Sequence, residues 1–230
     1  NMLNRLVLAG GDEFRDGCED MDVAILEATG KKYPEVFIVP TAAGQTNAVK
    51  SAGDGVRYFC NLGAIVSAVM VVDTDTANDP ENAEIIKRAD VVYFTGGDPS
   101  FLLRTLQNSV FLEGLRVAFN HGVIIAGSSA GAMVMCEWMN YDGWTKALNL
   151  IPGIAVLPHH EKNDPQSTKS YLQKSSPKGI RILGIDAKTC CFIDGDDWFV
   201  RGLGSVTLYT GNGWRRCRSG QGFNENNSPI

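Results

Sequence analysis

Two adjacent serines, Ser128 and Ser129, lie between two apolar runs in the segment "VIIAGSSAGAMVM". Gly127, Ser129 and Gly131 match the pattern G-x-S-x-G, in which a serine occupies a sharp strand-to-helix turn and small neighbours let the backbone pass. The pattern is short, so its context decides its meaning. An apolar strand is expected before it and an apolar helix after it, over residues 132–139, and both favour a nucleophile at Ser129 over a packing turn.

A serine hydroxyl becomes a good nucleophile when a base accepts its proton, which makes the three histidines of the chain the next candidates. His121 precedes Gly122 at the expected end of a helix, where an imidazole commonly binds terminal carbonyl groups, so a structural role is predicted. His159 and His160 follow the apolar run "IAVL" and should lie at an end of the same sheet as the serine. One of these two is predicted to be the base.

A third group should orient the imidazole and stabilise its charged form. Glu137 and Asp142 lie between the serine and the histidines, and Glu161 follows His159 by two residues. Asp142 is selected because its segment, "NYDGW", is expected to be a loop that can reach back. Glu161 competes for the role, and spacing alone does not choose between them; it is otherwise expected to face the α-amino group of a substrate.

Backbone N–H groups are the usual donors to the oxyanion that forms during acyl transfer. The N–H of Ala130, directly after the serine, is one expected donor. The segment "FTGGDPSFLL" should provide another from the turn that ends the fourth expected strand, and Gly97 is selected for it. Asp98 in the same turn and His160 are assigned to substrate binding.

Short apolar runs that alternate with segments of helical period predict a three-layer α/β fold with a mostly parallel sheet. These strands are apolar on both faces, as expected where helices cover a sheet on both sides. The predicted strands cover residues 5–11, 35–42, 64–73, 91–97 and 123–129. Predicted helices include one with Val49, Ala52, Val56 and Phe59 on its buried face, one over residues 79–90 that opens with Asp79 and Pro80, and one over residues 111–122.

The pattern changes after Ile180, where turn signals at Asp194-Gly195 and Gly211-Asn212-Gly213 separate shorter apolar runs. These features predict an antiparallel extension at the edge of the sheet, beginning near residue 185. The sequence has no Pro/Ser-rich linker, so residues 1–230 are interpreted as a single domain.

Composition narrows the classes of partner. The net charge of −5 and the single short basic group "WRRCR" argue against a nucleic-acid or anionic-membrane surface. No apolar run approaches the ~20 residues that span a bilayer, and the N-terminal segment lacks a signal-peptide pattern, so a cytoplasmic protein is expected. The six cysteines form no CxxC pair and are interpreted as reduced thiols, with no metal site.

The segments "FTGGDPSFLL", "GSSAGAMVM" and "PGIAVLPHH", in this order and spacing, resemble the serine peptidase family S51, which contains dipeptidase E and cyanophycinase. The resemblance covers most of the chain and implies a fold similar to class I glutamine amidotransferases. It also implies Ser129 as nucleophile, His159 as base and oxyanion donors at Gly97 and Ala130, with His160 where the family usually has Phe.

The chain departs from cyanophycinases around the base. Leu157-Pro158 precedes His159 in place of the usual Asp or Asp-Gln, and no arginine follows until Arg181. Arginines that would hold an aspartyl carboxylate are thus absent from the expected segment, and lysine does not reproduce their bidentate geometry. The cations considered as substitutes are Arg104, Lys162 and Lys169.

These observations predict a serine peptidase of exopeptidase or dipeptidase type that hydrolyses short peptides, aspartyl or β-aspartyl peptides among them, through an acyl-enzyme and without metal or organic cofactor. Two alternatives stay open. One is a module on the same scaffold that binds a small ligand without turnover, and the other is an amidase or esterase. The expected partner is a small peptide substrate, and a homodimer is one assembly that the sequence allows.

Overall fold

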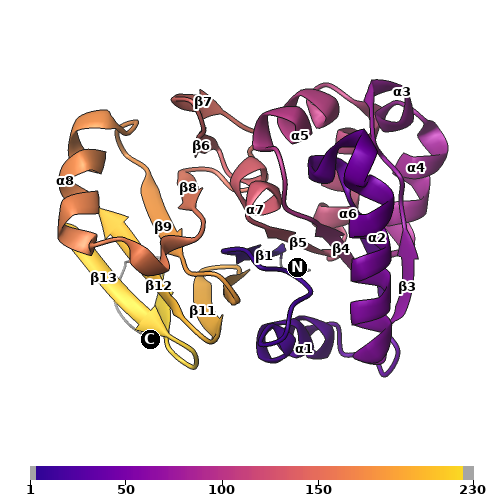
Figure 1. The fold of residues 1–230 in the computed structure, drawn as a ribbon, viewed down its shortest axis with the longest axis horizontal. Coiled ribbons are helices and arrows are strands. Elements are labelled where there is room, and N and C mark those ends of the chain that lie inside the picture. The colour runs from indigo at the N-terminus through magenta and orange to yellow at the C-terminus, as the bar shows by residue number, and fades with distance from the viewer. Residues whose placement is uncertain (1–3, 225–230) are drawn as a thin grey trace.

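The computed structural model describes residues 4–224 and contains two main sheets (Figure 1). The larger sheet has eight strands, and the four strand pairs from β1 through β5, β4 and β2 to the edge strand β3 are parallel. Its strands, in spatial order, are β14 (Gly222–Asn224), β11 (Asp197–Gly202), β10 (Thr189–Asp194), β1 (Arg5–Ala9), β5 (Ile124–Ser128), β4 (Val91–Phe94), β2 (Glu35–Val39) and β3 (Ile65–Ala68). The expectation of a mostly parallel α/β sheet is therefore confirmed.

Helices cover both faces of this sheet. Along β1, Leu6 and Leu8 face one apolar cluster, while Val7 and Ala9 face the other, because successive side chains of a strand point to opposite faces. One face packs on α1 (Glu19–Ala28) and α2 (Gly44–Asn61). The other packs on α3 (Thr74–Ala77), α4 (Pro80–Ile85), α5 (Pro99–Leu106), α6 (Val110–Asn120) and α7 (Ala130–Met135). Short 3₁₀ turns follow β2 at η1 (Thr41–Ala43) and α4 at η2 (Ile86–Arg88).

The strands after residue 150 divide between two sheets, which corrects the expectation of one antiparallel extension. Of these strands, within the described residues, β10, β11 and β14 alone extend the main sheet. A separate four-stranded sheet contains β8 (Ile154–Leu157), β9 (Arg181–Ile185), β12 (Ser205–Thr210) and β13 (Gly213–Arg218), with β8 parallel to β9. This sheet lies with η3 (His160–Lys162) and α8 (Pro165–Ser175) at one end of the molecule (Figure 1). The expected turns at Asp194-Gly195 and Gly211-Asn212 do join hairpin strands.

Three further expectations about local structure need correction. The predicted strand 64–73 is paired only over Ile65–Ala68, and Ile65 is 58% exposed because β3 is an edge strand whose outer side has no neighbour. Val49, expected on the buried face of α2, is exposed, whereas Phe59 is buried as predicted. The helix expected over 132–139 ends at Met135, and the chain enters the hairpin β6 (Trp138–Asn140) and β7 (Trp144–Lys146).

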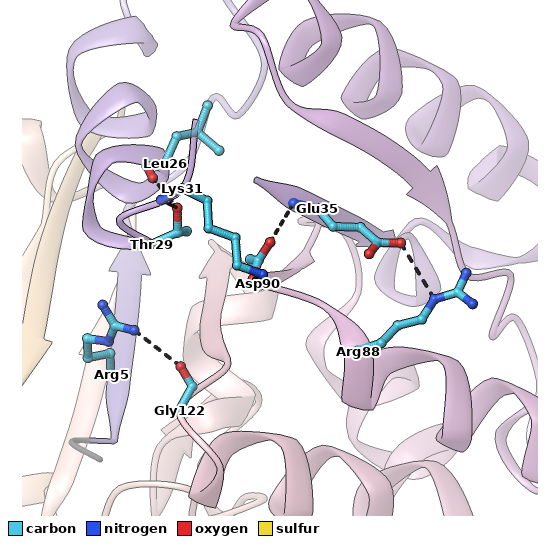
Figure 2. Close-up of polar contacts among 8 residues, drawn as sticks. All are labelled: Arg5, Leu26, Thr29, Lys31, Glu35, Arg88, Asp90 and Gly122. Atoms are coloured by element: carbon cyan, nitrogen blue, oxygen red, sulfur yellow. Dashed lines mark hydrogen bonds and ion pairs between the residues drawn. The ribbon is translucent and has the colours of Figure 1, made fainter. Parts of the chain in front are cut away.

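Polar contacts join the segments at the amino ends of the strands (Figure 2). The Asp90 carboxylate, before β4, accepts the Glu35 N–H at 2.8 Å and lies 2.6 Å from the Lys31 ammonium. The Arg5 guanidinium, at the start of β1, donates to the carbonyls of Gly122 and Ala28. These contacts join neighbouring segments at the amino ends of the strands. Open α/β sheets bind ligands at the carboxyl ends of their strands, so the candidate site is expected at the opposite edge.

None of the helices within residues 4–224 is long and apolar enough to cross a membrane.

Candidate active site

Ser129 occupies a strained turn between β5 and α7. Its backbone has φ 52° and ψ −111°, outside the regions that non-glycine residues prefer. The two flanking glycines are required by packing. A Cβ on Gly127 would lie 2.4 Å from the carbonyl oxygen of Gly131, and one on Gly131 would lie 2.5 Å from that of Phe94. The structure therefore has the geometry predicted for a nucleophile elbow.

The two adjacent serines have different surroundings. Ser128 is fully buried, and its hydroxyl donates to Glu13 Oε2 at 2.9 Å. Ser129 is partly exposed and lines a cavity of about 940 Å³ at the carboxyl ends of the strands. Only Ser129 is thus placed where a bound molecule could meet its hydroxyl.

His159 reaches the same cavity from the second sheet. It follows β8 in a left-handed conformation (φ 49°, ψ 48°) and is exposed. Its imidazole lies against the α-carbon of Gly11, where a Cβ would be 2.1 Å from the ring Cε1 and 2.5 Å from Nε2. The imidazole ring therefore packs directly against Gly11. No hydrogen bond joins Ser129 and His159 among the described residues, and such bonds often tighten only when a substrate is present.

The carbonyl groups at the end of β1 hold this arrangement in place. The Ser129 N–H donates to the Ala9 carbonyl at 3.0 Å, and the His159 N–H donates to the next carbonyl, that of Gly10, at 2.9 Å. The Gly11 carbonyl accepts the Lys188 N–H at 3.0 Å. Three successive residues of one segment thus fix the backbone of a serine from β5, a histidine from β8 and the loop before β10.

Two backbone N–H groups remain available next to the serine. Gly97 lines the cavity with φ 144°, and a Cβ there would lie 2.0 Å from the Ala42 carbonyl oxygen, so glycine is required. Within residues 4–224, neither the Gly97 N–H nor the Ala130 N–H, the first of α7, has a protein acceptor. Their positions suit the role predicted from the sequence.

Several predicted site residues lie elsewhere. Asp98 caps α5, where its Oδ1 accepts the Phe101 N–H at 3.0 Å, and it is not among the residues that line the cavity. His160 is 3% exposed, with its Nε2 2.6 Å from the Tyr209 hydroxyl, so the structure does not bring it to the cavity. Burial, followed by the charge of Arg216, lowers the pKa of His160 to about 4. His121, predicted to be structural, ends α6 with its Nδ1 2.7 Å from the Val117 carbonyl oxygen.

The two acids considered for the third position differ in placement. Asp142 lies at the exposed tip of the β6–β7 hairpin and is not among the residues lining the cavity. Glu161, which is also exposed and is not among the residues lining the cavity, lies in η3 two residues after His159, and its Oε2 accepts the Ala187 N–H at 3.0 Å. Burial raises the pKa of the Glu161 carboxyl, but this hydrogen bond and the charges of His159 and Lys162 outweigh it and leave the pKa below its ordinary value.

Glu13 is a cavity residue that the sequence prediction missed. Its Oε1 accepts the Gly96 N–H at 2.7 Å, and its Oε2 accepts the Ser128 hydroxyl. The available signal was the segment "GGDEF", in which an acid follows glycines directly after the first strand.

The charged residues lining the cavity are Asp12, Glu13, Arg15, Asp16, Glu19, Lys50, Asp54 and Arg57. Within residues 4–224, no three His, Cys, Asp or Glu side chains are grouped so that they could hold a metal ion.

Comparison with known proteins identifies the scaffold. The sequence model described as "Peptidase family S51" matches residues 6–201. Cyanophycinase of Synechococcus elongatus is 26% identical over 218 residues, which cover 88% of this chain and 67% of that protein. Peptidase E of a Nostoc species is 24% identical over 200 residues, which cover 78% of this chain and 76% of the relative.

Two solved structures agree with this match. The crystal structure of a peptidase from an acI-B1 Actinobacterium is similar with a TM-score of 0.85 at 26% identity and covers 97% of both chains. A putative peptidase E from Listeria monocytogenes has a TM-score of 0.64 at 20% identity, with 88% of this chain and all of that chain covered, and shows the fold alone. With the family match over nearly the whole chain, the chain belongs to peptidase family S51.

Proposed function

We propose that this protein is a serine peptidase that hydrolyses short peptides through an acyl-enzyme on Ser129. The observation that carries the proposal is the strained Ser129 turn at a cavity that His159 also lines. The family match supports peptide hydrolysis as the reaction. The overall arrangement also supports a scaffold of the class I glutamine amidotransferase type, with the elbow at the carboxyl end of a central parallel strand.

The residues of the cavity suit each step of this reaction. The Ser129 hydroxyl oxygen attacks the peptide carbonyl carbon while the His159 imidazole accepts the hydroxyl proton. The carbonyl oxygen becomes an oxyanion, to which the Gly97 and Ala130 N–H groups donate. The imidazolium then gives its proton to the leaving amine as the peptide C–N bond breaks. Water, activated by the same imidazole, hydrolyses the resulting ester and releases Ser129.

We further propose Glu161, in place of Asp142, as the acid that orients His159. Both acids are exposed and neither lines the cavity, but Glu161 lies two residues from His159, whose charge helps to lower the pKa of Glu161, whereas Asp142 lies at the tip of the β6–β7 hairpin. The carboxylate is itself held by the Ala187 N–H, as an orienting group should be. Glu161→Gln should then lower turnover more than Asp142→Asn, and with unchanged substrate affinity. The opposite order would restore Asp142 to the role.

The substrate class is proposed from the charges of the cavity and from the relatives. The cations at the cavity are Arg15, Lys50 and Arg57, and not Arg104, Lys162 or Lys169, which the sequence offered. Lys50 and Arg57 both pair with Asp54, at 2.7 and 2.6 Å, so a substrate carboxylate would compete with that acid. These cations and the likeness to cyanophycinase support an exopeptidase for aspartyl or β-aspartyl peptides.

Labelling with a fluorophosphonate tests the reaction type. This reagent phosphonylates an activated serine, so wild-type protein should be modified at Ser129 and at no other serine. Ser129→Ala and His159→Ala should abolish labelling, whereas Ser128→Ala should still become labelled at Ser129, at a lower rate. A folded wild type that stays unlabelled would instead support a module that binds a small ligand without turnover. Comparing hydrolysis of a dipeptide library with that of amides and esters then separates a peptidase from an amidase or esterase.

A further inference from the structure

The Glu13 carboxylate joins the two turns that flank the proposed oxyanion site. One oxygen, Oε1, accepts the Gly96 N–H at 2.7 Å, and the other, Oε2, accepts the Ser128 hydroxyl at 2.9 Å. Gly96 follows β4, Ser128 ends β5, and Glu13 follows β1, and these three strands are neighbours in the sheet. A single side chain thus crosses the carboxyl ends of three adjacent strands.

Each of these hydrogen bonds holds a residue close to a proposed catalytic group. Gly96 immediately precedes Gly97, and Ser128 immediately precedes Ser129 and its neighbour Ala130. The groups are also close in space, because a Cβ on Gly96 would lie 2.9 Å from Glu13 Oε1 and 3.4 Å from Ser129 Cβ. The distance between the Gly97 N–H and the Ala130 N–H therefore depends on how Gly96 and Ser128 are held.

We propose that Glu13 is a positioning residue that fixes the spacing of the two oxyanion donors relative to Ser129. This inference rests on the proposed acyl-enzyme reaction and adds a residue to it. Without the bridge, the turn after β4 and the elbow after β5 could move independently. Oxyanion donors act through a fixed placement, so a small increase in their freedom weakens catalysis more than it weakens binding.

The surroundings of Glu13 separate this role from that of a charge partner. Within the described chain, no Lys, Arg or His lies within ion-pair distance of its carboxylate, and both of its hydrogen-bond donors are neutral. A neutral amide of the same shape can preserve the bridge. Its oxygen would accept the Gly96 N–H, and its NH₂ would donate to the Ser128 oxygen, whose hydroxyl proton is free to rotate away. Glu13→Gln therefore keeps the bridge, whereas Glu13→Ala removes it.

The maximal rate of fluorophosphonate labelling and its half-saturating concentration measure this effect, because the phosphonyl oxygen occupies the oxyanion site. Glu13→Ala should lower the maximal rate about 100-fold and change the half-saturating concentration less than about threefold. Glu13→Gln should regain most of the rate, within about tenfold of wild type, since neutral hydrogen bonds are weaker than charged ones. The exposed Glu113 on α6 provides the control, and Glu113→Ala should label as the wild type does.

A double-mutant cycle adds a second readout. Ser128→Ala removes one of the two hydrogen bonds and should slow labelling about tenfold, because the Gly96 contact remains. The double variant Glu13→Ala/Ser128→Ala should be no slower than Glu13→Ala alone, since both changes break the same bridge. Additive effects would show that the two residues act separately and would overturn the proposal.

Other outcomes are equally decisive. Wild-type labelling of Glu13→Ala would overturn the positioning role. A Glu13→Gln variant as slow as Glu13→Ala would replace the bridge with a requirement for the negative charge. If Glu13→Ala does not fold, Glu13→Gln and the Ser128→Ala result still decide between these cases. If the wild type itself is not labelled, the proposed reaction fails, and hydrogen exchange of the Gly96 amide in Glu13→Ala still tests the bridge: faster exchange supports it, and unchanged exchange refutes it.

Discussion

Gly11 shows how closely a proposed catalytic group depends on a residue without a side chain. The His159 imidazole rests on the Gly11 α-carbon, and a Cβ there would overlap the ring at 2.1 Å. Gly11→Ala should therefore displace the imidazole and lower the labelling rate of Ser129 by about 100-fold, the effect expected for a misplacement of about 1 Å. The rate of fluorophosphonate labelling measures this effect, and circular dichroism checks that the variant is folded.

The matched control is Gly30, which follows α1. It has φ 69°, and a Cβ there would have no atom within 4 Å. Gly30→Ala carries backbone strain without a contact to the site, so it should reduce stability and leave the labelling rate of the folded protein unchanged. Equal labelling rates for Gly11→Ala and Gly30→Ala would contradict a steric role for Gly11.

At this scale the sequence indicated part of the site. Ser129, His159 and Gly97 line the cavity, as the sequence led us to expect. They could be predicted because a G-x-S-x-G turn, a strand end and a glycine turn are local patterns. The positions of Glu13 and Asp142 relative to the site could not be predicted from local patterns. Whether an acid reaches a given histidine depends on how loops fold in three dimensions. Asp142 was chosen because its segment was expected to be a loop that reaches back, and it lies instead at the tip of a hairpin, not among the residues that line the cavity.

At the level of elements, a buried carboxyl joins the two helices on one face of the sheet. Asp22 of α1 is fully buried and accepts a 2.7 Å hydrogen bond from the Tyr58 hydroxyl of α2. Its other oxygen, Oδ1, has no partner among the described residues, and the buried Tyr93 hydroxyl has none either. Burial raises the pKa of Asp22 to about 7, against the lowering effect of the Tyr58 hydrogen bond.

This pKa predicts how stability changes with pH. Between the ordinary aspartate pKa of about 4 and about 7, the folded protein keeps a proton that the unfolded chain has lost, so Asp22 lowers the free energy of unfolding as pH rises and has a constant effect above that window. Asp22→Asn should remove this dependence and stabilise the protein at pH 8 by on the order of 4 kcal/mol. Urea titrations at pH 5 and pH 8 measure the difference.

Asp20 on the exposed side of α1 is the control for that experiment. Asp20→Asn removes the same charge from the same helix and should leave the change between pH 5 and pH 8 as in the wild type. If Asp22→Asn destabilises the protein equally at both pH values, the carboxyl is ionised in the folded state and the predicted direction is wrong.

Elements differed in how well the sequence specified them. β1, β2, β4 and β5 were predicted because strands covered by helices on both faces are continuously apolar. β3 has equally apolar residues but lies at the edge, so its exposure followed from its neighbours and not from its own sequence. The short α7 ends where the chain turns into a hairpin, and no Gly or Pro marks this end in the apolar segment.

For the molecule as a whole, one apolar cluster continues through both sheets. It contains Leu6 and Leu8 of the main sheet and Leu183 and Leu208 of the second sheet. The pattern of strands and turns could not specify this division, because it identifies hairpins but not the sheet that each hairpin joins. The single-domain interpretation remains a prediction, and the shared cluster favours it.

Cooperativity of unfolding tests that prediction. Trp198 lies in β11 of the main sheet, whereas Trp138 and Trp144 pack beside the second sheet. If the chain is one cooperative unit, Trp198→Phe and wild-type protein should each give fluorescence and far-ultraviolet circular dichroism transitions in urea with the same midpoint for both probes. Separate midpoints for the two probes would show that the second sheet unfolds as an independent domain.

The carbonyl groups of Ala9, Gly10 and Gly11 determine when the site can assemble. Their partners, Ser129, His159 and Lys188, come from positions more than a hundred residues further along the chain. Contacts between such distant positions form after local structure, because closing long loops costs conformational entropy before any contact is gained. During synthesis, a chain that has emerged only as far as Ser129 has the proposed nucleophile but neither the proposed base, His159, nor Lys188. The order of the sequence thus delays assembly of the proposed site until the segments that contain His159 and Lys188 have been made.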